Sequence, residues 1–278
     1  MELYHQTSFK IARQVTRSYS TSFYLATRLL EKDVQAAIHG IYGFVRFADE
    51  IVDTFHGYDK EALIDKFETD LKQAINDKIS LNPVLHAFQL VIHRYDIPYD
   101  LVDSFLISMK MDLKKQIYQS KEETEAYVYG SANVVGLMCL KIFTCGIPGE
   151  YDRLKNPAEM LGSAFQKVNF LRDLRTDTAE LNRNYFSELN GDKFTDEDKF
   201  KLIDEIENEF DLAYRGIKEL PGRSKLAVLT AYYYYLALLR RIRNSKSEEL
   251  MSKRISVPNF IKILLMLRAI MNYNLKRI

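Results

Sequence analysis

The stretch YGFVRFADEIVDTF, residues 42–55, sets acidic side chains among large apolar ones. A helix of about 100° per residue gathers four of its polar side chains within about 60° of one another. They are Tyr42, Arg46, Asp49 and Asp53. Carboxylates four residues apart repel, and a helix that is apolar nearly all round is usually buried. Because buried carboxylates need a cation or hydrogen-bonding partners, the stretch predicts a functional face rather than a solvated charged stripe.

A second stretch, FQKVNFLRDLRTDTAE at residues 165–180, repeats this arrangement. Its polar residues are spaced by three, four and four, which places them within about 80° on one helical face. They are Gln166, Asn169, Asp173 and Asp177. Two such faces on separate helices indicate a shared site more strongly than one face alone. If they face each other, they form a cage of four carboxylates.

The donor set of this cage favours a hard divalent cation. Oxygen ligands suit Mg²⁺, which takes one or two carboxylates, keeps several waters and completes its shell with substrate phosphate. Neither face holds a histidine, which argues against zinc and di-iron centres. We therefore predict a Mg²⁺ diphosphate site, with Mn²⁺ as the alternative ion. Arg46 and Arg172 are expected to donate hydrogen bonds to phosphate oxygens. The predicted metal ligands are Asp49, Asp53, Asn169, Asp173 and Asp177.

Composition narrows the class of protein. The 278 residues are 47% hydrophobic and 28% charged, which allows a large core and argues against disorder. The net charge of +1 gives no overall field to attract nucleic acid, so none is expected as a partner. The opening MELYHQTSFK contains no apolar run, and no stretch of apolar residues is long enough to span a membrane. We expect a cytoplasmic protein.

Helical periodicity dominates the chain, and no alternating strand pattern persists. We predict an all-α fold, with about ten helices surrounding one core and a single domain over residues 1–278. The turns between them contain Pro, Gly, Asn and Asp, as in LNP at 81–83 and CGIPGE at 145–150. The predicted helices are 4–18, 31–55, 60–76, 82–95, 98–117, 122–144, 156–181, 195–218, 222–244 and 257–275.

The C-terminal segment VPNFIKILLMLRAIMNYNLKRI, residues 257–278, combines apolar residues with lysine and arginine. One interpretation is a terminal helix packed on the bundle. The other is a basic amphipathic helix that makes peripheral contact with a membrane surface. The sequence leaves both open, and it does not determine the oligomeric state.

These stretches together resemble the squalene and phytoene synthases, the head-to-head isoprenoid synthases. YGFVRFADEIVD and FQKVNFLRDLRTD resemble the two aspartate motifs of that family. Three further stretches also match, so the resemblance covers nearly the whole chain. They are SYSTSFYLATRLL at 18–30, YVYGSANVVGLM at 127–138 and KRISVP at 253–258. The chain departs from the family pattern at Tyr19, where a basic residue is common, at Asn133 in place of Gly, and at Thr176 in place of an acid.

The resemblance implies an isoprenoid synthase-like helical bundle around a central cavity, which joins two allylic diphosphates. It assigns the catalytic and substrate-binding roles residue by residue. The catalytic residues are expected to be Asp49, Asp53, Asp173, Asp177, Tyr42 and Tyr129. The substrate-binding residues are expected to be Ser20, Ser22, Arg46, Gln166, Asn169, Arg172, Tyr235 and Arg254. Aromatic faces stabilise carbocations, and Phe23 and Phe44 are further candidates for this role.

The family that this chain resembles divides into branches that form different products. Squalene synthases finish with hydride from NADPH, whereas phytoene synthases finish by losing a proton. DEIVD and KRISVP are closer to the phytoene synthases, so NADPH is not expected. The expected reaction joins two geranylgeranyl diphosphates to phytoene through a cyclopropyl diphosphate, the first committed step of carotenoid biosynthesis. The alternatives are a squalene or dehydrosqualene synthase that uses farnesyl diphosphate, and a non-catalytic relative that acts as a binding or assembly module.

Overall fold

The computed structural model describes residues 1–186 and 194–275, and throughout these ranges the chain is helical apart from turns and one isolated bridge between Ile117 and Asn184. The prediction of an all-α fold is confirmed. The elements are α1 (Glu2–Tyr19), α2 (Thr21–Thr27), α3 (Lys32–Asp53), α4 (Lys60–Asp77), α5 (Pro83–Tyr95), α6 (Tyr99–Lys114), α7 (Lys121–Val128), the π-helical segment η1 (Tyr129–Asn133), α8 (Val134–Phe143), α9 (Glu150–Ala179), α10 (Asp196–Ile217), α11 (Gly222–Asn244), α12 (Ser247–Leu250) and α13 (Asn259–Asn274).

Side-chain caps explain where several predicted helices begin. Asn82 accepts hydrogen bonds from the backbone N–H groups of Val84 and Leu85, and Pro83 occupies the first turn of α5. Thr195 and Asp198 form a reciprocal capping box at the start of α10. These residues satisfy N–H groups that have no partner inside the helix, so the turn chemistry read from the sequence fixes these boundaries.

Three of the local differences from the sequence prediction affect the walls of the cavity described below. Ser20 starts the unpredicted helix α2, because its hydroxyl accepts from the backbone N–H of Phe23 at 3.3 Å. Helix α9 begins at Glu150 instead of residue 156, and it contains Pro157, which the prediction placed near the start of the helix. Proline is most common in the first turn, so its tolerated position inside α9 misled the prediction.

The third difference is the π segment η1, which interrupts the predicted helix 122–144. A Cβ atom on Gly130 would lie 2.5 Å from the backbone oxygen of Ser104 and closer still to Ser108 Oγ. Glycine therefore allows η1 to approach α6 closely. Single π turns inside helices often occur at functional sites, and this one adjoins the cavity described below.

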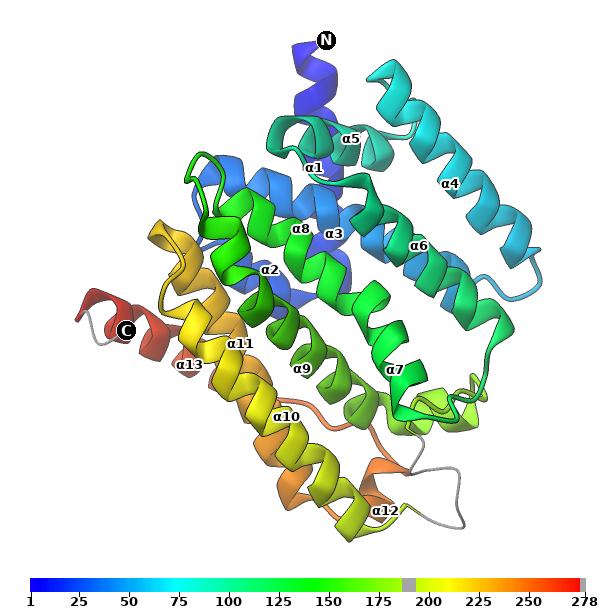
Figure 1. Cartoon of the computed structure of the whole chain (residues 1–278), viewed down its shortest axis with the longest axis vertical. Helices are drawn as coiled ribbons and strands as arrows, with labels where there is room; N and C mark the ends of the chain where they lie inside the picture. Colours follow the sequence, from blue (N-terminus) through cyan, green and yellow to red (C-terminus); the bar gives the residue numbers. More distant parts are fainter. Residues whose placement is uncertain (187–193, 276–278) are drawn as a thin grey trace.

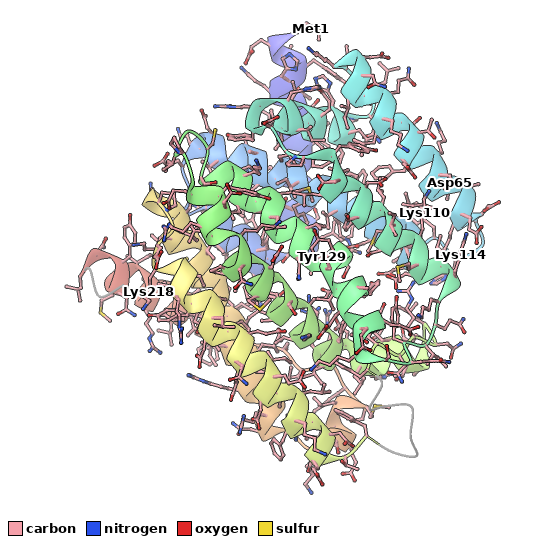
Figure 2. The ribbon with its side chains drawn as sticks, viewed as in Figure 1. Met1, Asp65, Lys110, Lys114, Tyr129 and Lys218 are labelled. Carbon is pink, nitrogen blue, oxygen red and sulfur yellow. The ribbon has the colours of Figure 1, made fainter. Side chains whose placement is uncertain are left out.

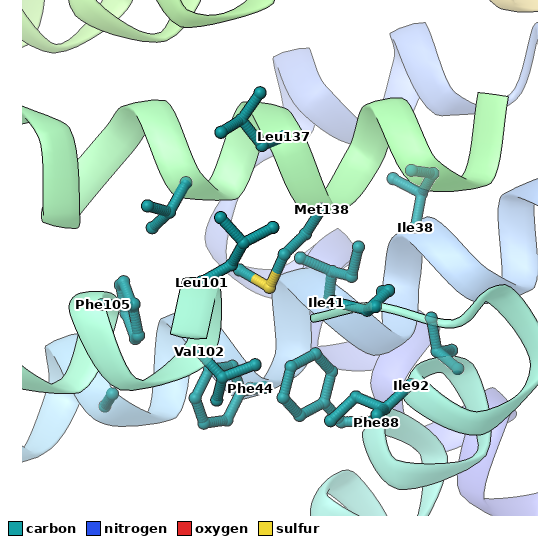
Figure 3. Close-up of a cluster of buried hydrophobic side chains, with 14 of the residues drawn as sticks. Ile38, Ile41, Phe44, Phe88, Ile92, Leu101, Val102, Phe105, Leu137 and Met138 are labelled. Carbon is teal, nitrogen blue, oxygen red and sulfur yellow. The ribbon is translucent and has the colours of Figure 1, made fainter. Parts of the chain in front are cut away.

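The buried apolar residues form two clusters. The first draws on α3, α4, α5, α6 and α8, and Figure 3 shows its centre, where Phe44 stacks on Phe88 with ring centroids 4.1 Å apart. The second draws on α9, α10, α11 and α13. In Figure 1, α8 lies beside α9, α3 packs on α8, and α10 and α11 lie on the other side of α9. The molecule therefore has two packed halves with α9 between them.

At the edge of the first half, ion pairs connect α4 and α6. Lys110 Nζ lies 2.6 Å from Asp65 Oδ1 and 2.6 Å from Glu68 Oε2, and Figure 2 labels Lys110 and Asp65. Such pairs contribute little at an exposed surface, so burial of apolar side chains is the main source of stability here.

One run in the described part of the chain, Lys121–Phe143, is long and apolar enough to cross a membrane by length and composition alone, with a mean hydropathy of 1.3. It comprises α7, η1 and α8 and packs against α6 and α9. Val134, Leu137 and Met138 are fully buried in the first cluster. A core helix passes the same test, and the packing of this run is that of a core helix.

Candidate active site

A cavity of about 810 Å³ lies between the two halves. Its walls come from α2, α3, α6, η1, α8, α9 and α11 and from the segment that leads into α13. All four aspartates of the two predicted faces line this cavity. The sequence prediction that α3 and α9 turn their acidic faces to a common space is therefore met by the geometry.

The cavity is acidic at one end and apolar at the other. Helix α9 contributes Asp177 and Asp173 at its C-terminal end and Leu154 and Ala158 near its N-terminal end. At 1.5 Å per residue, Ala158 lies about 22 Å along the helix axis from Asp173. The space thus suits a ligand with a charged head and a long apolar tail.

On the α3 face, Arg46 lies among its acidic neighbours. Its guanidinium forms an ion pair with Glu50, lies 4.0 Å from Asp49 Oδ2 and stacks over the Tyr19 ring at 4.4 Å. Within the described residues, Arg46 Nε is buried and has no hydrogen-bond partner. A buried donor without a partner is costly, so this atom is suited to a ligand oxygen. Glu50 is occupied by Arg46, which agrees with its omission from the predicted ligands.

The α3 carboxylates are short of positive charge. Burial, followed by the nearby Asp53 charge, raises the pKa of Asp49 to about 8, although Arg46 opposes the shift. A carboxyl group whose ionised form is disfavoured by burial and by a second carboxylate is stabilised by an added cation. The electrostatics of Asp49 are therefore those of a cation-binding position.

On the α9 face, Asp173 is held by two arginines. Arg172 Nε lies 3.0 Å from Asp173 Oδ1, and Arg254 Nε approaches the same oxygen at 2.7 Å. Among the described residues, no arginine or lysine forms an ion pair with Asp177, and burial together with the Asp173 charge raises its pKa to about 7. Asp177 is thus the α9 counterpart of Asp49.

A residue that the sequence interpretation missed, Arg183, joins the two faces. Its Nη1 donates to Asp53 Oδ1 at 2.7 Å and lies 3.9 Å from Asp112 Oδ2. The charges of Asp53 and Arg183 also act on Asp177, in opposite directions. Arg183 follows α9 by only a few residues, yet no helical pattern includes it, so periodicity gave no signal for it.

Arg183 contacts a buried hydrogen-bond network around Asp112. Tyr127 donates to Asp112 Oδ2 at 2.5 Å, and Tyr185 donates to Asp112 Oδ1 at 3.2 Å. Burial raises the pKa of Asp112 to about 6, while Arg183 and the Tyr127 hydroxyl oppose the shift. The network orients Arg183 toward Asp53. A lone acid on an otherwise apolar helix face was the available sequence signal for Asp112.

A chain of amides and hydroxyls crosses the cavity wall beside the α9 aspartates. Tyr235 donates to Asn169 Oδ1 at 3.2 Å, and Asn169 Nδ2 donates to Gln166 Oε1 at 3.3 Å. Gln166 Nε2 then reaches Ser131 Oγ at 3.5 Å. Phe165 stacks on Tyr235 with ring centroids 3.8 Å apart, which fixes the orientation of the tyrosine. These predicted residues therefore lie together.

The N-terminal motif forms the opposite wall. Ser20 and Ser22 line the cavity at α2, next to Phe23, whose ring stacks on Tyr42 at 5.0 Å. Burial raises the pKa of Tyr42 to about 12, so its hydroxyl stays protonated at neutral pH. Tyr42 and Phe23 therefore present neutral aromatic faces to the cavity.

Two of the aromatic residues predicted for the site, Tyr129 and Phe44, do not line the cavity. Tyr129 is 39% exposed and does not line the cavity, and it is labelled in Figure 2. Side chains two positions apart on a helix point in directions about 200° apart. Because Tyr127 points inward, Tyr129 therefore points outward. Phe44 is fully buried in the first core cluster, stacked between other phenylalanines, and does not reach the cavity.

The described residues fit a divalent cation held jointly with a ligand. Among residues 1–186 and 194–275, no group of three or more His, Cys, Asp or Glu side chains is placed to hold a metal ion alone. The expected cage made wholly of protein carboxylates is therefore not preformed, because arginines pair with Asp53 and Asp173. Mg²⁺ needs only one or two carboxylates when phosphate and water supply the rest, and Asp49 and Asp177 supply such positions.

The family model for squalene/phytoene synthase matches residues 16–260. The chain belongs to the squalene/phytoene synthase family, and it is a prenyltransferase.

The curated relatives include plant and cyanobacterial enzymes. Phytoene synthase 2, chloroplastic, from Solanum lycopersicum is 30% identical over 249 residues, which span 82% of this chain and 79% of the relative. The 15-cis-phytoene synthase of Synechocystis sp. is 29% identical over 289 residues, which span 93% of this chain and 83% of the relative.

Solved structures support the fold. A dehydrosqualene synthase in complex with ligand superposes with a TM-score of 0.82 at 21% identity, covering 97% of this chain and 98% of that one. The squalene synthase HpnC from Alicyclobacillus acidocaldarius gives a TM-score of 0.74 at 22% identity, covering 87% and 95% of the two chains.

Proposed function

We propose that this enzyme joins two geranylgeranyl diphosphates head to head to give phytoene, the first committed step of carotenoid biosynthesis. One observation carries the proposal. A single cavity has facing aspartates at one end and an apolar wall that extends about 22 Å from Asp173 to Ala158. The relatives named as phytoene synthases support this choice of substrate over farnesyl diphosphate.

In this proposal the polar end binds the two diphosphates. Arg46, Arg172 and Arg254 donate hydrogen bonds to phosphate oxygens, with Ser20, Ser22, Gln166 and Asn169 orienting the head groups. The bound substrate competes with Asp173 for Arg172 and Arg254, which frees carboxylate oxygens. Bound Mg²⁺ would neutralise the diphosphates and favour their departure, with Asp49, Asp53, Asn169, Asp173 and Asp177 as the proposed ligands and Mn²⁺ as the alternative ion.

The apolar end controls the hydrocarbon chemistry. The first allylic C–O bond breaks as diphosphate leaves, and the double bond of the second substrate attacks the allylic cation. Loss of a proton closes the cyclopropyl diphosphate. The second C–O bond then ionises, the skeleton rearranges, and a second proton leaves to give phytoene without a reductant, so NADPH is not required. Tyr42, Phe23 and Tyr235 present aromatic faces that stabilise cations without reacting as water does.

We further propose that residues 1–278 form one catalytic domain, which acts on substrates that partition into membranes. We accordingly propose a cytoplasmic enzyme with peripheral membrane contact and no nucleic-acid partner. The reaction itself requires only the cavity and its polar end.

Product analysis tests the proposal. Purified protein is incubated with Mg²⁺ and either geranylgeranyl or farnesyl diphosphate, with and without NADPH, and hydrocarbons are identified by mass spectrometry. The expected result is a forty-carbon product from geranylgeranyl diphosphate that does not depend on NADPH. A thirty-carbon product alone would assign the enzyme to the dehydrosqualene branch, and dependence on NADPH would assign it to the squalene branch.

A further inference from the structure

Helix α13 exposes a continuous apolar face that packing leaves uncovered. Its inner side packs on α11, with Ala269 fully buried. At about 100° per residue, the exposed large apolar side chains fall within about 120° on the opposite side. They are Phe260, Ile263, Leu264, Leu267, Met271 and Leu275. Their exposed fractions range from 48% for Ile263 to 65% for Phe260. Exposed apolar patches of this kind mark interaction sites.

The segment that contains this face carries charge of one sign, and two of its cations, Lys253 and Arg254, pair with acids on other elements, Glu249 and Asp173. From Met251 to the end of the sequence there is no aspartate or glutamate. The basic residues of this region are Lys253, Arg254, Lys262, Arg268, Lys276 and Arg277. Arg268 is exposed and lies at the edge of the apolar stripe. A helix with an apolar face and basic flanks binds anionic lipid surfaces, since lipid tails accept the apolar side chains and head groups pair with the cations.

The position of α13 relative to the cavity adds an independent reason. Arg254 and Val257, which precede the helix, line the cavity, as does Lys262 in its first turn. Arg254 is also 63% exposed, so this segment lies where the cavity opens to solvent. Figure 1 shows α13 at the outer edge of the molecule beside α11. The exposed face and the cavity mouth are therefore parts of one segment.

We propose that the exposed face of α13 docks this enzyme on the surface of an anionic lipid bilayer, next to the cavity mouth. Docking in this place would let long apolar chains pass between the bilayer and the cavity without crossing water. The docking surface itself depends only on α13, whereas its role in transferring substrate and product rests on the proposed function. Lipid binding and product formation are therefore measured separately.

Vesicle flotation tests the docking. The full-length protein is mixed with vesicles of phosphatidylcholine alone or of phosphatidylcholine mixed with phosphatidylglycerol. We expect binding to the anionic vesicles, weaker binding to the neutral ones, and a decrease in high salt because exposed charges are screened. Leu264→Glu and Leu267→Glu should each lower binding by about tenfold or more, because each removes an exposed leucine that docking would bury in the bilayer and adds a charge that anionic lipids repel.

The matched control is Leu81→Glu, which alters an exposed leucine on the loop between α4 and α5. It should bind vesicles as the wild type does. All variants should retain the circular dichroism and the detergent-supported activity of the wild type, because neither Leu264 nor Leu267 lines the cavity. If the wild type shows no activity in detergent, that result would contradict the proposed function. It would leave the flotation result unaffected.

Equal vesicle binding by the wild type and the α13 variants would refute the proposal. Light scattering distinguishes the other occupant of this face. A dimer that dissociates in Leu264→Glu, without vesicle binding by the wild type, would assign the face to a second copy of the chain and also refute lipid docking.

Discussion

Arg183 Nη1 donates a hydrogen bond to Asp53 Oδ1 at 2.7 Å, linking residues 130 positions apart. The arginine side chain is only 7% exposed and also lies 3.9 Å from the buried Asp112 carboxylate. It therefore joins the end of α3, the end of α6 and the segment after α9 at the polar end of the cavity. Neutralising this cation leaves two carboxylates facing each other without compensation.

Arg183→Gln should lower the free energy of unfolding by about 3 kcal/mol, because removing one partner of a buried charge cluster leaves the other unpaired. Urea unfolding measures this change. The double variant Arg183→Gln with Asp112→Asn should recover part of the loss, since it removes the carboxylate that Arg183 compensates. Strictly additive losses in the two variants would show that Arg183 and Asp112 are not coupled.

Asp177→Asn should stabilise the metal-free protein while reducing activity. Burial and the Asp173 charge disfavour the Asp177 carboxylate, so a neutral amide removes repulsion in the absence of a cation. Thermal unfolding should therefore show a higher Tm without Mg²⁺ and a smaller Tm increase when Mg²⁺ and inorganic diphosphate are added.

The matched variant for this experiment is Asp53→Asn, in the other motif. It should lower the Tm of the metal-free protein because it breaks the ion pair with Arg183. If both asparagine variants shifted the Tm in the same direction, the contrast between a repelled and a paired carboxylate would be wrong.

Tyr127→Phe should destabilise the protein, and Tyr129→Phe should not. The Tyr127 hydroxyl donates to the buried Asp112 carboxylate at 2.5 Å, and a hydrogen bond to a charged group contributes about 1.5–3 kcal/mol. Tyr129 is 39% exposed and lies outside the cavity. Denaturant midpoints and product yields of the two variants provide the comparison, and equal effects would contradict the assignment of Tyr127 as the inward residue.

Stability should fall as the pH drops from about 6.5 toward 4, in part through His39. Burial, and then the charge of Arg13, lowers the pKa of His39 to about 4. The unfolded state therefore binds a proton at higher pH than the folded state, and stability is lost as pH falls through this window. The full effect is about 3 kcal/mol.

Urea unfolding across this pH range measures the His39 contribution. His39→Gln should flatten the slope, whereas His93→Gln, which alters an exposed histidine on α5, should leave it unchanged. An unaltered slope in His39→Gln would assign the acid sensitivity to other groups.

Ala158→Phe should reduce the use of geranylgeranyl diphosphate more than that of farnesyl diphosphate. Ala158 lines the apolar end of the cavity, about 22 Å along α9 from Asp173, so added bulk there shortens the space for a long chain. Competition between the two substrates, read as the ratio of their kcat/KM values, measures the effect. Ala62→Phe, at an exposed position on α4, is the control for a general effect of added bulk.

Local sequence patterns predicted much of the site. The two acidic faces were found because helical spacing fixes which residues share a face, and the structure places their aspartates on one cavity. Asp112, Tyr127, Arg183 and Tyr185 were not found. Tyr127 lies two residues from Tyr129 in the same motif, and only the packing of α7 and η1 against α6 decides which of the two points inward.

The sequence by itself determined the helical fold, several helix boundaries and the two aspartate faces, since periodicity and capping depend on residues a few positions apart. Only the tertiary structure decided which carboxylates are paired with arginine and which are left short of positive charge. That difference depends on Arg183 and Arg254 reaching aspartates on other elements, and the packing of the two halves around α9 brings those groups together.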